Sequence, residues 1–147
     1  MAEPEKTTTQ WIPPQFARED ILIYLAWKPE MEKRYTKIEY NVHLGGDKGG
    51  PEEEKVFSEM WKKLSARRVD AVGYAEDHTA LIEFRKFAGP SAIGQLIMYK
   101  SLWEREKDIS KPIKLILVTD IATDPIITTA KNIGIELIIV TQPREEF

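Results

Sequence analysis

The sequence predicts a single α/β domain in which a mixed central sheet is flanked by helices. The main observation is an alternation along the chain, where short apolar runs typical of strands are separated by segments whose apolar residues recur at helical spacing. The second is length, because 147 residues, 42% of them hydrophobic, can bury one sizeable core but not two comfortable ones. The chain also contains no cysteine, so disulfides and thiolate zinc sites are excluded.

The amino-terminal part is expected to consist of an arm followed by two strands. Residues 1–15 contain three prolines and a threonine run without a period, so we interpret them as a flexible arm and residues 16–147 as the domain. The short apolar run from Ile21 to Trp27 ends at Lys28-Pro29 and favours a strand. A second strand is predicted where apolar residues alternate with polar ones, at Ile38, Tyr40, Val42 and Leu44.

The rest of the chain carries the expected core, at about residues 51–140. Helices are predicted from Pro51 to about Ser65, from the N-cap Ser91 to about Lys107, and from the N-cap Asp124 to a stop at Gly134. Strands are predicted within residues 68–77, 79–87, 113–120 and 135–140. The first two should form a hairpin with a turn near Glu76-Asp77, and helical crossovers should link the later strands.

Three charged residues interrupt the apolar run at residues 79–87. Side chains alternate along a strand, so Glu83 and Arg85 should share one face while Lys86 points to the other. Asp70 interrupts the preceding apolar strand, and antiparallel pairing would bring it beside Glu83. Two carboxylates on adjacent strands repel each other and are costly to bury unless a positive charge lies between them. A magnesium ion, which takes one or two protein carboxylates and keeps several waters, would satisfy both.

These residues and the helix after them resemble a known family. Asp70, then Glu83-Phe84-Arg85, then "AIGQLIMYKSLW" are together similar to the PD-(D/E)xK, or restriction-endonuclease-like, nuclease superfamily, and within it to RecB-type nucleases and archaeal Holliday junction resolvases. The resemblance covers roughly Pro51 to Val140. It implies a restriction-endonuclease-like mixed sheet, here with an N-terminal strand extension, and hydrolysis of DNA phosphodiesters with Mg²⁺ or Mn²⁺.

The resemblance also implies roles for particular acids. Asp70 and Glu83 would ligate the metal, and the family's acid on the first helix maps onto Glu53, which lies on the apolar face of the helix predicted from Pro51. For Glu53 the alternative is a helix N-terminal acid that interacts with the helix dipole. Asp70 taken alone is typical of a strand end, and Glu83 with Arg85 taken alone is typical of an ion pair on a solvated strand. Their occurrence in order is what favours a site.

On the predicted helix that follows, the resemblance implies that Gln95 and Tyr99, one turn apart, contact DNA or orient the site. The departure from the family is Arg85, where its members have lysine. Arginine keeps its proton and cannot act as a general base, although it can hold a phosphate and stabilise charge developing on it. Lys100, next to Tyr99, could supply an ammonium group instead. The alternative to a nuclease is therefore a nuclease fold that has lost catalysis and serves as a nucleic-acid-binding or assembly module. A third interpretation is a structural α/β protein with no nucleic-acid role.

The remaining expectations concern partners and location. The net charge of −3 argues against a polycation that coats nucleic acid, although residues 62–68 contain a basic cluster. No apolar run reaches the length of a membrane span, and no signal pattern begins the chain, so an intracellular, cytoplasmic protein is expected. The small size suits a nuclease that is associated with a phage, a virus or a mobile element, or one that serves repair. The N-terminal arm and strands could pair two subunits into a homodimer.

Overall fold

The computed structural model describes residues 11–13, 16, 18–44, 68–107 and 109–140. In chain order the elements are α2 (Arg18–Arg34), β1 (Lys37–His43), β2 (Arg68–Tyr74), β3 (Thr79–Phe87), α4 (Pro90–Glu106), β4 (Ile113–Ile121), α5 (Asp124–Asn132) and β5 (Ile135–Ile139). Most of the predicted arm and the whole helix predicted from Pro51, with Glu53, lie outside these residues.

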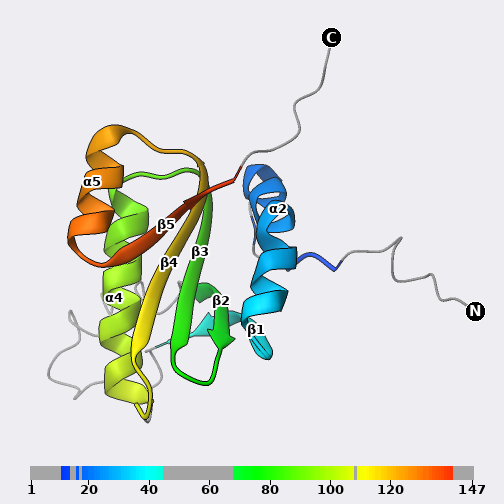
Figure 1. Cartoon of the computed structure of the whole chain (residues 1–147), viewed down its shortest axis with the longest axis vertical. Coiled ribbons are helices and arrows are strands. Elements are labelled where there is room, and N and C mark those ends of the chain that lie inside the picture. Colours follow the sequence, from blue (N-terminus) through cyan, green and yellow to red (C-terminus); the bar gives the residue numbers. More distant parts are fainter. Residues whose placement is uncertain (1–10, 14–15, 17, 45–67, 108, 141–147) are drawn as a thin grey trace, which may run out of the picture.

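The strands form one five-stranded mixed sheet in the order β1-β2-β3-β4-β5. β1, β2 and β3 are antiparallel neighbours, whereas β3, β4 and β5 run parallel and are connected through α4 and α5. Figure 1 shows α2 on one face of the sheet and α4 with α5 on the other. The predicted α/β class, mixed sheet and hairpin are therefore confirmed.

Each face of the sheet has its own core. The α2 side buries Ile23, Tyr24, Trp27 and Met31 of α2 against Ala80, Ile82 and Phe84 of β3. The other side buries Ala92, Ile93, Leu96, Tyr99 and Trp103 of α4 against Leu81, Leu115 and Leu117. Adjacent β3 residues thus belong to opposite layers, as the period of a strand requires. Helices cover both faces of β3 and β4, and the Glu83 side chain of β3 is held inside the molecule.

The strand predicted at Ile21 to Trp27 is wrong, because this segment lies within the helix α2. Its buried residues Ile23, Trp27 and Met31 follow each other at steps of four, which is the spacing of one helical face. A run of seven apolar residues hides this period, and Pro29 looked like a terminator although it lies inside the helix. The predicted N-terminal strand extension is accordingly reduced to β1.

The second predicted strand is confirmed as β1. Its apolar residues, however, do not all lie on one face, as their alternation had predicted. Ile38 and Tyr40 pack into the α2-side core, whereas Val42 and Leu44 pack on the α4 side. The change of side occurs at Asn41, whose φ of +58° is in the left-handed region. Across the strand pair, Tyr40 is opposite Ala71 and Val42 is opposite Val69, so the change of side lies beside Asp70.

The predicted helix starts need small corrections. The N-cap of α4 is Gly89 with Pro90 in the first turn, rather than Ser91, and the N-cap of α5 is Thr123, so that Asp124 belongs to the first turn. Gly134 ends α5 with φ of +85°, a conformation that favours glycine. Among the described helices, none is both long and apolar enough to cross a membrane.

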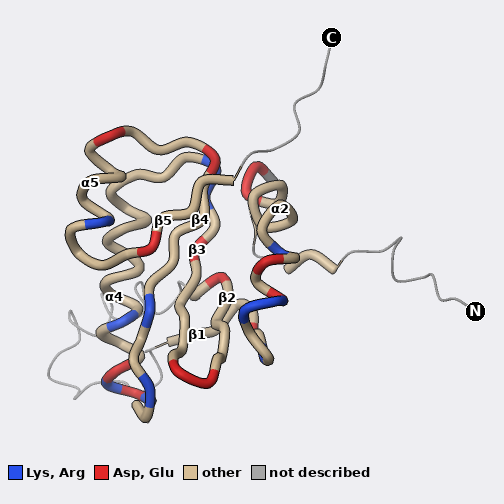
Figure 2. The backbone as a smooth tube through the Cα atoms, viewed as in Figure 1, with Lys and Arg blue, Asp and Glu red and all other residues tan. Residues whose placement is uncertain are grey.

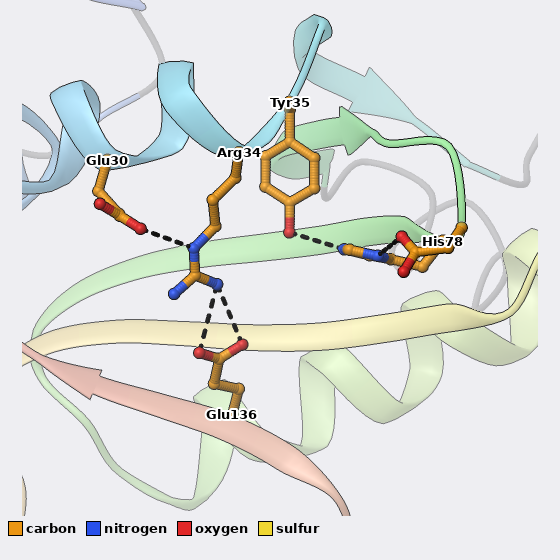
Figure 3. A network of polar contacts seen from close by, with 6 residues as sticks. Glu30, Arg34, Tyr35, His78 and Glu136 are labelled. Atoms are coloured by element: carbon orange, nitrogen blue, oxygen red, sulfur yellow. Dashed lines mark hydrogen bonds and ion pairs between the residues drawn. The ribbon is translucent and has the colours of Figure 1, made fainter.

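Side chains join the carboxyl end of α2 to two other parts of the sheet (Figure 3). Arg34 donates from Nη1 to the carboxylate of Glu136 on β5 at 3.3 Å and forms an ion pair with Glu30 at 3.0 Å. The Tyr35 hydroxyl is hydrogen bonded to Nε2 of His78, in the turn between β2 and β3, at 2.9 Å. The contacts of Arg34 with Glu136 and of Tyr35 with His78 link residues far apart in the sequence, and they lie apart from the predicted site.

Candidate active site

Glu83 is an ionisable side chain inside the sheet, and it is only 1% exposed. Figure 2 shows that β3 carries an acidic position between the helical layers, whereas many charged positions lie in loops and at helix ends. The Glu83 carboxylate accepts a hydrogen bond from the Asp70 backbone N–H at 3.4 Å and forms an ion pair with Nη2 of Arg85 at 2.6 Å. Antiparallel pairing therefore brings β2 and β3 together as expected, with Asp70 and Glu83 in contact.

Asp70 lies where the hydrogen-bonded ladder between β2 and β3 ends. Paired residues run from Tyr74 and Thr79 to Ala71 and Ile82, one position short of Asp70. Its Oδ2 accepts the Phe84 backbone N–H at 2.9 Å and so replaces a backbone acceptor of the ladder. This bond fixes the carboxylate beside β3. The local change of side at Asn41 and Asp70 thus explains why an acid in an apolar strand points neither into a core nor into solvent.

Arg85 connects the two acids to α4. Its guanidinium lies 3.5 Å from Oδ2 of Asp70, in addition to its contact with Glu83, and donates to the Phe84 carbonyl at 2.9 Å and to Oε1 of Gln95 at 2.7 Å. The Arg85 side chain is 28% exposed, so one part of the cluster reaches solvent. The side chains that meet here come from β2, β3 and α4. We call three of them, Asp70, Glu83 and Arg85, the acid cluster, and Gln95 contacts it from α4.

Asp20, in the first turn of α2, is an acid of this region that the sequence analysis missed. Its Oδ1 accepts the Lys86 backbone N–H at 2.8 Å, and burial raises the pKa of its carboxyl while the charge of Arg85 lowers it. The sequence does contain a signal for this acid, because Asp20 comes directly before an apolar segment, as acids in the first turn of a helix do. It was overlooked because that segment was interpreted as a strand.

Burial dominates the electrostatics of the carboxyl pair. It raises the pKa of Asp70 to about 6, although the Phe84 N–H and the charge of Arg85 oppose the increase. It also raises the pKa of Glu83 well above its ordinary value, and the charge of Asp70 adds to the increase. For Arg85 burial acts to lower the pKa, but the charges of Glu83, Asp70 and Asp20 outweigh it and raise the pKa.

A hydrogen bond between the two carboxyl groups further separates their pKa values, lowering that of Asp70 and raising that of Glu83. Such a bond needs one proton between them. The guanidinium of Arg85 lies against both acids and so compensates their charge. Arg85 thus occupies the position in which the sequence analysis expected a metal ion to balance the acids.

The donor set fits a magnesium or manganese ion with two protein ligands. Carboxylate oxygens are the ligands that these ions prefer, and two carboxylates with water are sufficient for magnesium. Within the described ranges, no group of three or more Asp, Glu or His residues could hold a metal. Metal binding at the pair would require loss of the shared proton and displacement of the guanidinium from at least one oxygen.

The other predicted residues differ in their positions. Tyr99 is buried and donates its hydroxyl to the Arg68 carbonyl at 3.2 Å, so it holds the start of β2. Lys100 is exposed on α4, and Lys86 is on the opposite face of β3 from Arg85. Glu53 lies outside the described residues. The structure therefore joins Gln95 directly to the acid cluster, whereas Tyr99 supports β2 rather than facing solvent.

Comparison of the chain with protein-family models, with curated proteins and with solved structures found no match.

Proposed function

We propose that this chain is a metal-dependent nuclease of the PD-(D/E)xK type that hydrolyses DNA phosphodiesters, with Asp70 and Glu83 as ligands of Mg²⁺ or Mn²⁺. One observation carries the proposal: two carboxyl groups from adjacent strands converge on Arg85, which Gln95 of the next helix also contacts. These are the residues that the family resemblance selects, and the antiparallel register of β2 and β3 places Asp70 beside Glu83.

The position of Asp20 adds support for a restriction-endonuclease-like fold. The resemblance implies an acid on the first helix, and α2 precedes the three antiparallel strands. Asp20 lies in the first turn of this helix and is near enough to change the pKa values of Asp70 and Arg85. We therefore prefer Asp20 to Glu53 as the acid of the first helix, with a role in shaping the field of the site.

The residues can be given distinct roles. A bound metal would polarise the phosphate and lower the pKa of a coordinated water. Asp70 and Glu83 supply oxygen ligands after their shared proton has left. Arg85 keeps its proton, so it holds the phosphate and stabilises the charge that develops there rather than acting as a base. Gln95 orients the Arg85 guanidinium through its side-chain oxygen.

The experiment is a cleavage assay with manganese on single-stranded, duplex and branched DNA. Cleavage by the wild type that is lost in Asp70→Asn and in Glu83→Gln would support the proposal. Arg85→Lys, which restores the residue of the family, should cleave at least as fast as the wild type. Cleavage that survives both acid substitutions would show that the acid cluster is not the active site.

The second candidate is a binding or assembly module without catalysis, and the position of Arg85 favours it. Its Nη2 lies 2.6 Å from Oε2 of Glu83, so a residue of the chain already compensates the acids. No cleavage of any substrate, together with DNA binding that weakens as salt is raised, would favour this candidate. A homodimer stays a prediction, and sedimentation at several concentrations would test it.

A further inference from the structure

An apolar row lies at the carboxyl end of the parallel strands, at the same end of β3 as Arg85. The last residue of each parallel strand is a large and exposed apolar residue: Phe87 of β3 is 59% exposed, Ile121 of β4 is 43% exposed and Ile139 of β5 is 51% exposed. Phe87 and Ile121 are directly paired in the β3–β4 ladder. Single exposed apolar residues are common, but here Phe87 and Ile121 are cross-strand neighbours, and Ile139, opposite Thr119, ends the next strand.

Phe87 is the member of this row that lies closest to the acid cluster along the chain. Arg85 and Phe87 are two residues apart and share one face of β3, a separation of about 6.6 Å along a strand. The ammonium of Lys86 lies 5.8 Å from the centre of the Phe87 ring. An exposed aromatic ring with an associated cation is the combination with which proteins stack a nucleobase and hold the adjoining phosphate.

The position in the fold agrees with this chemistry. In open α/β sheets, ligands bind outside the carboxyl ends of the parallel strands. The Phe87 ring is at this edge, whereas Glu83 lies four residues further back on β3, with Asp70 of β2 beside it. A base inside a duplex is stacked on its neighbours, so it can reach a flat ring only when it is unpaired.

We propose that Phe87 stacks an unpaired base of the nucleic acid, with Lys86 near the adjoining phosphate, so that the preferred substrate is single-stranded DNA or DNA with unpaired nucleotides. This inference rests on the proposed nuclease function and assigns its substrate class. Ile121, paired with Phe87, extends the apolar surface beside the stacked base.

The test is fluorescence anisotropy with labelled oligothymidylate and with a labelled hairpin duplex, in EDTA so that no hydrolysis occurs. Wild type should bind the single strand more tightly than the duplex. Phe87→Ala and Phe87→Leu should weaken single-strand binding about tenfold, and Phe87→Trp should retain it, because stacking requires an aromatic face. Duplex binding should change less than twofold. Ile133→Ala, which removes a 45% exposed apolar side chain away from the row, is the control.

Three outcomes would overturn the inference: no single-strand binding by the wild type, wild-type affinity in Phe87→Ala, or full rescue by leucine. Concentration-dependent dimerisation that Phe87→Ala abolishes would also overturn it, by assigning the row to self-association. The proposed function is tested separately through Asp70 and Glu83. If the chain cleaves duplex DNA with a metal and substitution of Phe87 has no effect, the nuclease function stands and the stacking role of Phe87 is refuted. If single-strand binding depends on Phe87 but no DNA is cleaved, the stacking role stands and the nuclease function is refuted.

Discussion

At the scale of single residues, Asp70 and Glu83 bind protons more tightly in the folded chain than in the unfolded chain. Folding raises the pKa of Asp70 from 3.8 to about 6, chiefly through burial, and raises that of Glu83 in the same direction. When a group binds protons more tightly in the folded state than in the unfolded state, the protein loses stability as pH rises and the group is deprotonated. The contribution of Asp70 is therefore favourable below about pH 4 and is lost as pH rises to about 6.

Asp70→Asn should remove this loss. The amide oxygen can still accept the Phe84 N–H, but the side chain no longer titrates. Relative to wild type, the variant should therefore gain stability between pH 4 and pH 7, by up to about 3 kcal/mol. Urea unfolding at several pH values measures the difference. Parallel stability curves for the two proteins would show that the pKa of Asp70 is not raised by folding.

The sequence predicted which residues form the acid cluster, but not that Arg85 compensates the charge of the two acids. Strand alternation placed Glu83 and Arg85 on one face, and antiparallel pairing placed Asp70 beside them. The sequence could not predict that the guanidinium of Arg85 would lie against both acids, because this depends on side-chain rotamers and on the contact with Gln95. Asp20 was missed because its helix was interpreted as a strand, and Asn41 gives no signal of a left-handed conformation beside Asp70.

At the scale of elements, strong periodicity was sufficient for β2, β3, α4, β4, α5 and β5, whereas α2 was missed. The parallel strands of the sheet are continuous apolar runs bounded by turn residues, so their type was predictable. In α2 the apolar run extends over both the buried and the partly exposed faces, and Pro29 interrupts the pattern. Only packing against Phe84 and Ile82 selects the helix.

Pro29→Ala tests the helical assignment of residues 18–34. A proline in a helix interior removes a hydrogen bond and costs about 3 kcal/mol. The substitution should therefore stabilise the protein, by about 1 to 3 kcal/mol because the helix has already adapted to the ring. Thermal unfolding provides the measurement. Pro112→Ala, in the loop before β4, is the matched control and should be neutral or slightly destabilising.

A pair of glycines tests how closely α2 and the sheet approach. A Cβ at Gly73 would lie 2.6 Å from the Tyr35 ring, so Gly73→Ala should destabilise the protein by about 1 to 3 kcal/mol. At Gly94, in α4, a Cβ meets no described atom within 4 Å. Gly94→Ala should instead stabilise the protein by about 0.5 to 1 kcal/mol. Chemical denaturation of both variants gives the comparison, and equal effects would contradict the close contact at Tyr35.

At the scale of the whole molecule, Arg34 joins α2 to β5 across 102 positions of the chain. Both side chains of its ion pair with Glu136 are about one-third exposed, so the coupling should be modest, about 0.5 to 1 kcal/mol, and should fall as salt is raised. A double-mutant cycle with Arg34→Met and Glu136→Gln measures it. A coupling near zero at low salt would mean that this ion pair does not help to hold α2 against the sheet.

The whole-molecule assignment depends on whether the carboxyl pair holds a metal, and manganese titration by calorimetry tests this most directly. Wild type should bind about one Mn²⁺ with release of protons. Affinity should increase as pH rises through 6, because Asp70 and Glu83 must be deprotonated. Asp70→Asn and Glu83→Gln should abolish binding, while Lys100→Met should leave it unchanged. Absence of binding at pH 8, or binding that both acid substitutions leave intact, would contradict the proposal.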